Sequence, residues 1–523
     1  MKNLKKIKRA LITVSDKSQL DILTKGLVKF GIKIISTGGT GKFLKELSIP
    51  YTPIKKLTGH SELFSGRIKT ISFEIISALL FDRSSKTHLD EANKLGIKPI
   101  DLVVCNLYPF KKVSSECDEI PLLVENIDIG GVTLLRSGAK NFNDVVVCSS
   151  PNQYNELLKT LKKMDGQTDI GLRQKFSLQA FRTTMLYDAV ISSKFGLLYN
   201  KKRPTFCILP TNVKKLRYGE NPHQSGWFYS QINGKNNWIQ INGKKLSYNN
   251  YLDIDSSTSV AGDIINEVKS RKLPSAVVIV KHTNPCGVAI AKNQLTALKL
   301  AWAGDTVSSF GSVICFTEVV KEETAKWLFN RFIEIVIAPE FSSEAKRIFK
   351  KKKNLRLIKM KKSESTKFNI RSINGGFLVQ TNDRKLIDPF EAKTKHKFNN
   401  KDKILARFGL VIVKYIKSNA IVLVKSTCDG LSLIGAGVGN PNRIVSIHQA
   451  LKKAVENGEK NLSDSILISD AFLPFSDSVE YANKFNIKKI VQPGGSIKDK
   501  EIISICDKFG IAMVFTNTRH FKH

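Results

Sequence analysis

A lysine and a histidine stand at the end of a buried-strand pattern in the second half of the chain. Residues 276–280 are apolar and mostly β-branched, which predicts a buried strand, and Lys281 and His282 follow at once. The Asn-Pro-Cys-Gly segment at 284–287 is expected to break this strand, so both side chains should lie at the edge of a sheet. Two like charges resist coexisting in a partly desolvated cleft, which favours a neutral imidazole able to accept a proton beside a cation. A plain strand cap that faces water explains the same residues, and the segment alone leaves both interpretations open.

Glycine-rich turns with hydroxyl groups follow the first strands of the chain. Residues 10–14 predict a strand, and Ser15 and Asp16 offer N-cap chemistry for a helix with apolar residues at 20, 23, 27 and 30. A second strand at 33–36 runs into Thr-Gly-Gly-Thr-Gly at 37–41, a turn that can present backbone N–H groups to phosphate. This β-α-β order predicts a parallel sheet. The turn is not a P-loop, because position 36 is Ser and Lys42 precedes Phe.

Polar residues recur at the ends of two further predicted strands. The strand at 102–105 leads into Asn106 and Tyr108, and another strand is expected at 145–148. Between them, Asp128 precedes a Gly-Gly pair and a cationic segment that ends in Lys140. A structural turn explains the glycines alone, but it does not explain why Lys, Asn and Tyr recur at several strand ends.

Composition bounds the class of protein. A chain of 523 residues is expected to form two to four domains, and the first should close near residue 200, where a polar, Pro-terminated linker begins. The sequence holds no apolar stretch of about 20 residues and no secretory segment, which predicts a cytoplasmic protein without a membrane partner. The eight cysteines are scattered without Cys-x-x-Cys or zinc-like spacing, so neither disulfides nor a zinc site are expected.

The net charge of +37 raises the question of a nucleic-acid partner. The lysines are spread through every segment instead of forming one patch with interleaved aromatic residues, which is typical of a compositional bias at tolerant surface positions. We therefore expect no nucleic-acid partner; the basic charge can instead attract anionic small molecules such as nucleotides.

A series of motifs follows the linker in a fixed order. They are Leu-Arg-Tyr-Gly-Glu-Asn-Pro-His-Gln at 216–224, the segment 243–250, Lys281-His282, Ser-Phe-Gly at 309–311, Lys-Ser-Asn-Ala at 417–420, Gly-Ala-Gly at 435–437, the segments 469–472 and 492–496, and Arg-His-Phe-Lys-His at 519–523. Over essentially its whole length the chain resembles the bifunctional purine biosynthesis family. In this family, aminoimidazole carboxamide ribonucleotide (AICAR) formyltransferase is fused to inosine monophosphate (IMP) cyclohydrolase.

The resemblance implies an α/β fold in two parts. Residues 1–200 would form a methylglyoxal-synthase-like parallel-sheet domain that carries the cyclohydrolase. Residues 201–523 would form the formyltransferase as a duplicated cytidine-deaminase-like α/β domain of two similar subdomains, without a catalytic metal. The resemblance also implies an obligate homodimer, because the family's active site forms across two subunits.

For the second part, the resemblance implies formyl transfer from 10-formyltetrahydrofolate, a co-substrate, to the 5-amino group of AICAR. His282 would be the general base, Lys281 its partner and Asn419 the donor to the oxyanion. The matching ribonucleotide positions are Arg217, Tyr218, Asn249 and Arg519; those near the folate are Phe310, Gly311 and Asp477; and Arg443 is a further binding position.

For the first part, the resemblance implies dehydrative closure of formyl-AICAR to IMP. The positions that match phosphate-binding residues are Ser15, Lys17, Ser36, Thr37 and Gly38. The rest of the pocket would comprise Arg67, Lys69, Thr70, Asn106, Tyr108, Asp128, Gly130 and Lys140. Among these, Lys69, Tyr108, Asp128 and Lys140 are chemically suited to stabilise and move the protons of ring closure.

Two segments depart from the family's pattern. After Thr70 the family usually continues Leu-His-Pro-Lys-x-His-Gly-Gly, whereas residues 71–78 read Ile-Ser-Phe-Glu-Ile-Ile-Ser-Ala. Near Arg443, the Val-Gly-Asn segment at 438–440 makes the loop two residues longer than usual. Three hypotheses follow: a working bifunctional enzyme, a formyltransferase whose impaired cyclohydrolase domain still binds nucleotide, and a non-catalytic basic nucleotide- or nucleic-acid-binding protein. The order of the motifs favours the first.

Overall fold

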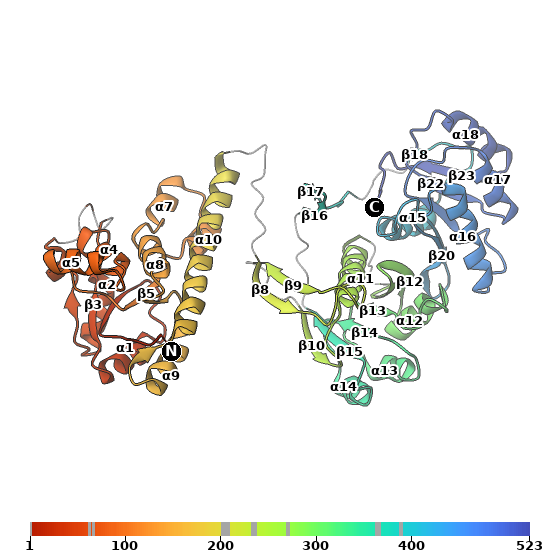
Figure 1. Ribbon diagram of the computed structural model, residues 1–523. Coiled ribbons are helices and arrows are strands. Elements are labelled where there is room, and N and C mark those ends of the chain that lie inside the picture. Colours follow the sequence, from red (N-terminus) through yellow and green to blue (C-terminus); the bar gives the residue numbers. More distant parts are fainter. Residues whose placement is uncertain are drawn as a thin grey trace. The chain divides into compact units, whose positions relative to one another are not determined.

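The chain separates into two compact units, Met1–Leu209 and Pro210–His523, each built on its own sheet (Figure 1). The computed structural model describes residues 3–60, 64, 68–199, 210–231, 238–267, 272–360, 368–385 and 391–523. The domain boundary expected near residue 200 lies in the range 200–209, which is outside the described residues. Among the helices of the described ranges, none combines the length and the apolar character that crossing a bilayer requires.

The first unit holds a five-stranded sheet in the order β4-β3-β2-β5-β6, and its strand pairs are all parallel. The predicted parallel sheet is therefore confirmed. The strands are β2 (Arg9–Val14), β3 (Lys33–Ser36), β4 (Thr52–Pro53), β5 (Leu102–Asn106) and β6 (Val146–Cys148). The chain order reverses between β2 and β5, so their carboxyl ends flank a topological switch point, where sheets of this kind bind ligands.

Helices cover both faces of this sheet, because alternate strand residues point to opposite sides. Ile12 and Val104 belong to one core with the apolar faces of α1 and α9, whereas Leu11 and Val103 belong to a second core with α4 and α8. The helices are α1 (Leu20–Lys29), α2 (Gly38–Glu46), α3 (Lys55–Thr58), α4 (Phe73–Leu80), α5 (Lys86–Lys94), α6 (Phe110–Glu116), α7 (Ile120–Glu125), α8 (Gly130–Lys140), α9 (Tyr154–Lys163) and α10 (Ile170–Tyr199). A short pair, β1 (Lys5–Lys6) and β7 (Gln167–Thr168), lies outside the main sheet.

The expectation that Ser15 and Asp16 cap α1 is wrong. The N-cap of α1 is Gln19, in the left-handed conformation and without a side-chain cap bond. The carboxylate of Asp16 instead accepts hydrogen bonds from the backbone N and the Oγ of Ser18. A turn thus separates the end of β2 from the helix.

The second unit is built on one twelve-stranded sheet in the order β10-β15-β14-β13-β11-β12-β20-β19-β21-β22-β23-β18. Its two halves repeat one pattern outward from the central β12–β20 pair: an antiparallel hairpin, an antiparallel neighbour, two parallel strands and an antiparallel edge strand. Each hairpin also carries a register shift near its middle. The expected two similar halves are therefore visible in the strand order.

The strands of the first half are β10 (Trp238–Asn242), β11 (Ser275–Lys281), β12 (Asn284–Ala291), β13 (Val313–Phe316), β14 (Ile335–Ala338) and β15 (Arg356–Met360). Those of the second are β18 (Glu391–Ala392), β19 (Ile421–Ser426), β20 (Gly430–Gly437), β21 (Ile466–Ser469), β22 (Lys489–Gln492) and β23 (Ala512–Phe515). Two hairpins lie apart from the sheet: β8 (Pro210–Lys215) with β9 (Trp227–Gln231), and β16 (Phe368–Ile373) with β17 (Gly376–Thr381).

The helices repeat with the strands. On one face, α11 (Tyr248–Glu267) and α15 (Asn400–Val413) share a core that spans both halves. On the other face, α12 (Gln294–Ala303), α13 (Glu322–Phe329) and α14 (Ser343–Lys350) cover the first half, and α16 (Arg443–Glu456), α17 (Asp477–Lys484) and α18 (Asp499–Lys508) cover the second. Because one core crosses the midline, the two halves form a single body.

The expected break at 284–287 is wrong. Asn284 opens β12, and Pro285 and Gly287 lie within that strand. The register of β11 against β12 shifts between Ile279 and Val280, opposite Gly287 and Pro285, and such a bulge accommodates a proline without a backbone N–H. The chain therefore turns two residues earlier than expected, at His282 itself.

Candidate functional site

His282 and Thr283 form the two-residue loop of the β11–β12 hairpin. Lys281 pairs with Asn284 across the loop, and the φ angles of His282 and Thr283 are 51° and 65°. Two positive φ angles are the mark of a type I′ turn, which usually takes Asn and Gly. A β-branched residue such as Thr283 rarely adopts this conformation, so the turn is strained and must be held by its surroundings.

Lys281 contacts two residues that are predicted to bind the folate, Phe310 and Gly311, at this edge of the sheet. Its Nζ donates to the carbonyl of Phe310. Gly311 has φ 69°, and a Cβ there would lie 3.3 Å from that Nζ and 3.0 Å from the ring of Phe332. The Phe310 ring is 59% exposed and lies 5.0 Å, centroid to centroid, from the ring of Phe332. Lys281, Phe310 and Gly311 thus form one contiguous surface with an accessible aromatic face.

Asn419 lies at the same edge, just before β19. Lys417 donates from its backbone N to Asn284 Oδ1 at 3.4 Å, which joins this segment to the hairpin of His282. Arg443 Nη2 donates to Asn419 Oδ1 at 2.6 Å, while Asn419 Nδ2 donates to the carbonyls of Asn440 and Pro441 at 2.9 and 3.1 Å. Residues from the two halves therefore converge here, and the longer loop at 438–440 contacts the predicted oxyanion donor directly.

Arg443 is buried, and its guanidinium supports the Asn419 segment from the interior of the unit. It begins α16, and its guanidinium donates to Ser469 Oγ at 3.0 Å and pairs with the fully buried carboxylate of Asp470. The other oxygen of Asp470 accepts from Ser418 Oγ at 2.6 Å. The structure thus places Arg443 as a support of the 418–419 segment.

Three predicted ribonucleotide positions lie together near α11. The Arg217 guanidinium carbon lies 5.5 Å from the ring centroid of Tyr218. Asn249 Nδ2 donates to the carbonyl of Glu220 at 3.2 Å, which ties the segment after β8 to the first turn of α11. The Arg217 side chain is exposed and available to an anion.

Arg519 and Asp477 lie in the second half of the unit. Arg519 lines a cavity of about 350 Å³ with Phe472, Asn517 and the Pro493–Gly495 turn, at the carboxyl ends of β21–β23. The tail that carries Arg519 runs back to the Asn419 segment, because the backbone N of His520 donates to the carbonyl of Asp470 at 2.9 Å and the backbone N of Lys522 donates to Ser418 Oγ at 3.1 Å. Asp477 is exposed at the start of α17, and its carboxylate accepts from Ser478 Oγ at 3.2 Å.

In the first unit, the predicted phosphate positions gather at the carboxyl edge of the sheet. Asn106, at the end of β5, accepts at Oδ1 from the backbone N of Ser15 and of Asp16, at 2.7 and 2.8 Å. Gly38 begins α2, and Thr37 Oγ1 lies 3.0 Å from Thr13 Oγ1. Lys17 follows in the same loop and is half-buried. A helix N-terminus beside a lysine is a suitable anion site.

Ser36 differs from its neighbours. Its hydroxyl is buried and donates to the carbonyl of Ile12 at 2.9 Å, so it links β3 to β2.

A second cluster surrounds Asp128. The backbone N–H groups of Gly131 and Tyr108 donate to its two carboxylate oxygens at 2.7 and 3.3 Å. Burial raises the pKa of Asp128, although these hydrogen bonds and the charge of Lys69 oppose the shift. A Cβ on Gly130 would lie 2.7 Å from Thr70 Oγ1. Lys69, Thr70, Tyr108, Asp128 and Gly130 are thus brought together, and Tyr108 stands two residues beyond Asn106.

One predicted residue lies apart from this cluster, and another is not described. Lys140 is exposed at the far end of α8, about 15 Å along the helix from Gly130 at 1.5 Å per residue. Arg67 lies outside the described residues.

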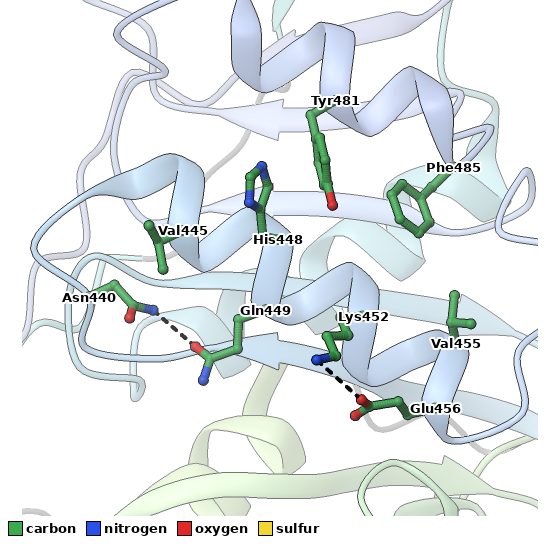
Figure 2. A pocket seen from close by; sticks show the side chains of 9 residues that line it. All are labelled: Asn440, Val445, His448, Gln449, Lys452, Val455, Glu456, Tyr481 and Phe485. Atoms are coloured by element: carbon green, nitrogen blue, oxygen red, sulfur yellow. Dashed lines mark hydrogen bonds and ion pairs between the residues drawn. The ribbon is translucent and has the colours of Figure 1, made fainter.

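Sequence reasoning missed two features of the second unit. Asp253 and Ser256 of α11 bond both backbone groups of Thr283; an acid and a serine one helical turn apart were the available signal. A groove of about 680 Å³ runs between α16 and α17, where His448 and Tyr481 rings lie 3.7 Å apart and Asn440 Nδ2 donates to Gln449 Oε1 at 2.9 Å (Figure 2). Within the described ranges, no group of three or more His, Cys, Asp or Glu residues is arranged to hold a metal ion.

Fold and sites together define a two-unit α/β enzyme with an anion-binding sheet edge in one unit and a Lys-His pair beside an asparagine in the other. The family description "AICARFT/IMPCHase bienzyme" matches residues 138–453, and "MGS-like domain" matches residues 20–133. Proteins named "Bifunctional purine biosynthesis protein PurH" are similar over full length. The one from Clostridium acetobutylicum is 41% identical over 99% of this chain and 100% of its own. The one from Petrotoga mobilis is 40% identical over the same shares.

The chain belongs to the AICARFT/IMPCHase bienzyme family and is a bifunctional enzyme of purine biosynthesis. A solved structure named "Crystal structure of ForH" is 30% identical and covers 36% of this chain and 97% of its own, with a TM-score of 0.33.

Proposed function

We propose that the second unit transfers a formyl group from 10-formyltetrahydrofolate to the 5-amino group of AICAR at the Lys281–His282 turn, and that the first unit closes formyl-AICAR to IMP. The observation that carries the proposal is the convergence of His282, Lys281 and Asn419 at one sheet edge, from both halves of the second unit. Neither the comparisons nor the described residues favour an impaired cyclohydrolase or a non-catalytic binding protein.

Formyl transfer joins the AICAR amine to the formyl carbon and breaks the bond from that carbon to the folate nitrogen. The amine is weakly nucleophilic because its lone pair is delocalised into the imidazole ring, so His282 takes its proton during attack and returns it to the leaving folate nitrogen. Lys281 and Asn419 stabilise the tetrahedral oxyanion between these two events. Arg217 and Asn249 hold the ribonucleotide, and the exposed face of Phe310 packs against the folate.

Ring closure joins the carboxamide nitrogen to the formyl carbon and expels water. The phosphate binds at the N-terminus of α2 with Ser15, Lys17 and Thr37, and the ring lies toward Asp128. Asp128 is half-buried, and burial raises its pKa, so it holds a proton more readily than an exposed carboxyl; Lys69 and Tyr108 stand beside it. Lys140 is proposed from the resemblance alone.

The proposal includes a homodimer that works in the cytoplasm on soluble substrates without a catalytic metal. The homodimer is proposed from the resemblance to the family alone.

A coupled assay tests both activities at once. Purified protein is given AICAR and 10-formyltetrahydrofolate, and tetrahydrofolate release and IMP formation are followed separately. His282→Ala should abolish tetrahydrofolate release and leave ring closure of supplied formyl-AICAR intact. Equal loss of both activities in a folded dimer would contradict the assignment of one site to each unit.

A further inference from the structure

The turn that carries His282 departs from what its own sequence favours. Both of its residues have positive φ, yet neither is Gly or Asn, and Thr283 is β-branched. A left-handed conformation is unfavourable for such a residue, because its Cβ comes too close to the following carbonyl oxygen. The turn also sits on the exposed end of a hairpin, where it would relax toward another geometry if nothing held it.

Two side chains of helix α11 form hydrogen bonds with the backbone N–H and the carbonyl of Thr283. Asp253 Oδ1 accepts from the backbone N of Thr283 at 2.7 Å, and Ser256 Oγ donates to the carbonyl of Thr283 at 2.6 Å. The two side chains are three residues apart and so lie on one face of the helix. Ser256 is only 6% exposed, and the bond to Asp253 is charge-assisted, so neither contact is a loose surface bond.

Helix α11 is itself held in place by a hydrogen bond and by packing in the core, so the two side chains hold Thr283 rigidly. Asn250 Nδ2 donates to Glu334 Oε2 at 3.0 Å, and Ile254, Val260 and Ile264 are buried in the core that spans both halves. A group held by a packed helix fixes its partner more closely than one held by a loop.

The charge of Asp253 also faces the reacting pair. Burial raises the pKa of this carboxyl, while the bond from Thr283 and the nearby charges of His282 and Lys281 oppose the shift. A partly desolvated carboxylate therefore lies near the proposed base and its cationic partner.

We propose that Asp253, with Ser256, is a positioning residue for formyl transfer: it holds Thr283 in the left-handed conformation and thereby aims His282 at the substrate amine. The inference rests on the role proposed for His282. Asp253 acts through the turn and does not contact the reacting atoms.

The variants are made in the full-length chain and both activities are measured on each preparation. Asp253→Ala removes the acceptor for the Thr283 N–H and should lower kcat of formyl transfer by roughly 10- to 100-fold, while KM for AICAR changes less than about threefold, because binding groups elsewhere remain. Asp253→Asn keeps an acceptor oxygen and should retain most of kcat. Thr258→Ala is the matched control, because the Thr258 hydroxyl bonds only to carbonyls of its own helix.

A rescue separates positioning from general disruption. Glycine accepts positive φ at no steric cost, so Thr283→Gly added to Asp253→Ala should recover at least about threefold in kcat. Ring closure by the first unit should be unchanged throughout and reports the amount of intact chain, while the fluorescence of the four tryptophans, all in the second unit, reports that this unit is folded. Full formyl transfer by Asp253→Ala, or a loss in Thr258→Ala as large as in Asp253→Ala, would overturn the inference. A wild-type chain without formyl transfer, or a fully active His282→Ala variant, would instead overturn the proposed function.

Discussion

Arg443 donates from Nη2 to the side-chain oxygen of Asn419 at 2.6 Å, and this bond fixes which way the amide of Asn419 points. Arginine has no acceptor, so the amide oxygen must face it and the NH2 group must face away. The two N–H bonds then meet the carbonyls of Asn440 and Pro441. Substrate binding must exchange one of these carbonyls for the oxyanion if Asn419 is to stabilise it.

Asn419→Asp tests this orientation. The carboxylate can still accept from Arg443, but its second oxygen cannot donate to an oxyanion and would face two carbonyl oxygens. We expect kcat of formyl transfer to fall by about 10²–10³, the usual cost of losing one oxyanion donor. Tetrahydrofolate release measures the loss, and ring closure in the other unit is the control. Retention of more than a tenth of the wild-type kcat would show that Asn419 is not the donor.

Arg443 is also one member of a buried ion pair. Breaking this pair should lower the stability of the second unit. Arg443→Leu leaves the Asp470 carboxylate, which is 0% exposed, without its cation and should cost about 3–5 kcal/mol of unfolding free energy. The four tryptophans at 227, 238, 302 and 327 all lie in the second unit, so tryptophan fluorescence in urea follows that unit alone.

Lys452→Ala on the same helix is the matched control. Its partner Glu456 lies 3.7 Å away, and both side chains are more than half exposed, so its loss should stay within about 0.5 kcal/mol. Equal losses in the two variants would contradict the buried-pair argument.

The sequence predicted the helices and strands, and the sheet edges that carry the candidate residues, better than it predicted the turns between strands. Residues 33–36 form β3 as expected, because apolar β-branched runs admit few alternatives. Pro285 argued for a break, since a proline in an apparent strand is accommodated only at an edge or a bulge, and the bulge at Cys286 becomes visible only from the pairing of β12 with β11.

The supports of the sites could not be predicted, because they join residues far apart in the chain. Asp253 in α11 reaches Thr283 in the β11–β12 turn, and Arg443 in α16 reaches Asp470 after β21; the spacing of Asp253 and Ser256 was a local signal, but it did not name the partner. The end of a buried-strand pattern identified Lys281 as a candidate and the resemblance to the family identified Asn419, but that they meet at one sheet edge was visible only in the fold.

The close approach of Gly130 to Thr70 leads to a prediction for the first unit. A Cβ at this position would lie 2.7 Å from Thr70 Oγ1, so Gly130→Ala should displace Thr70 or the start of α8 and lower kcat of ring closure by at least about tenfold. Gly171→Ala is the control: its Cβ would meet only Asp169 Oδ1, at an ordinary 3.5 Å, and it lies in the helix α10. IMP formation from supplied formyl-AICAR gives the readout. Unchanged activity in Gly130→Ala would show that the close approach is not needed.

The raised pKa of Asp128 predicts a pH-dependent stability. Since the folded carboxyl binds its proton more tightly than the unfolded one, its contribution to stability is least favourable at neutral pH and improves as pH falls through the folded pKa toward 3.8. Asp128→Asn removes the ionisation, so its unfolding free energy relative to wild type should decline between pH 7 and pH 4.

Asp16→Asn is the control for that pH series. The bonds from Ser18 lower the pKa of Asp16, so its relative unfolding free energy should stay flat from pH 7 to about pH 5 and then rise slightly as pH falls through 3.8 toward the lowered pKa; the rise is small because this carboxylate is exposed. Calorimetry of the full chain measures the unfolding of both units, and the differences from wild type at each pH give the effect of the two substitutions, which both lie in the first unit. Parallel trends in the two variants would contradict the burial of Asp128.

The segment at 71–78 is the sharpest test of ring closure, because it differs most from the family's usual pattern. Ser72 caps α4 by accepting from the backbone N of Ile75 at 3.3 Å, and Glu74 lies in the first turn, where a negative charge is favourable. Ala78 is buried in the core beneath the helix. The segment therefore forms a capped, packed helix of its own.

The double variant Ser72→His with Glu74→Lys restores the family's usual residues at two of these positions. It removes the cap and reverses the favourable charge, so we expect the first unit to lose about 1–2 kcal/mol of stability and to gain no ring-closure activity. Ile76→His, a third position of the same pattern, serves as the single-site comparison. A large gain in IMP formation by the double variant would mean that these substitutions impair the cyclohydrolase, and would favour a chain whose main activity is formyl transfer.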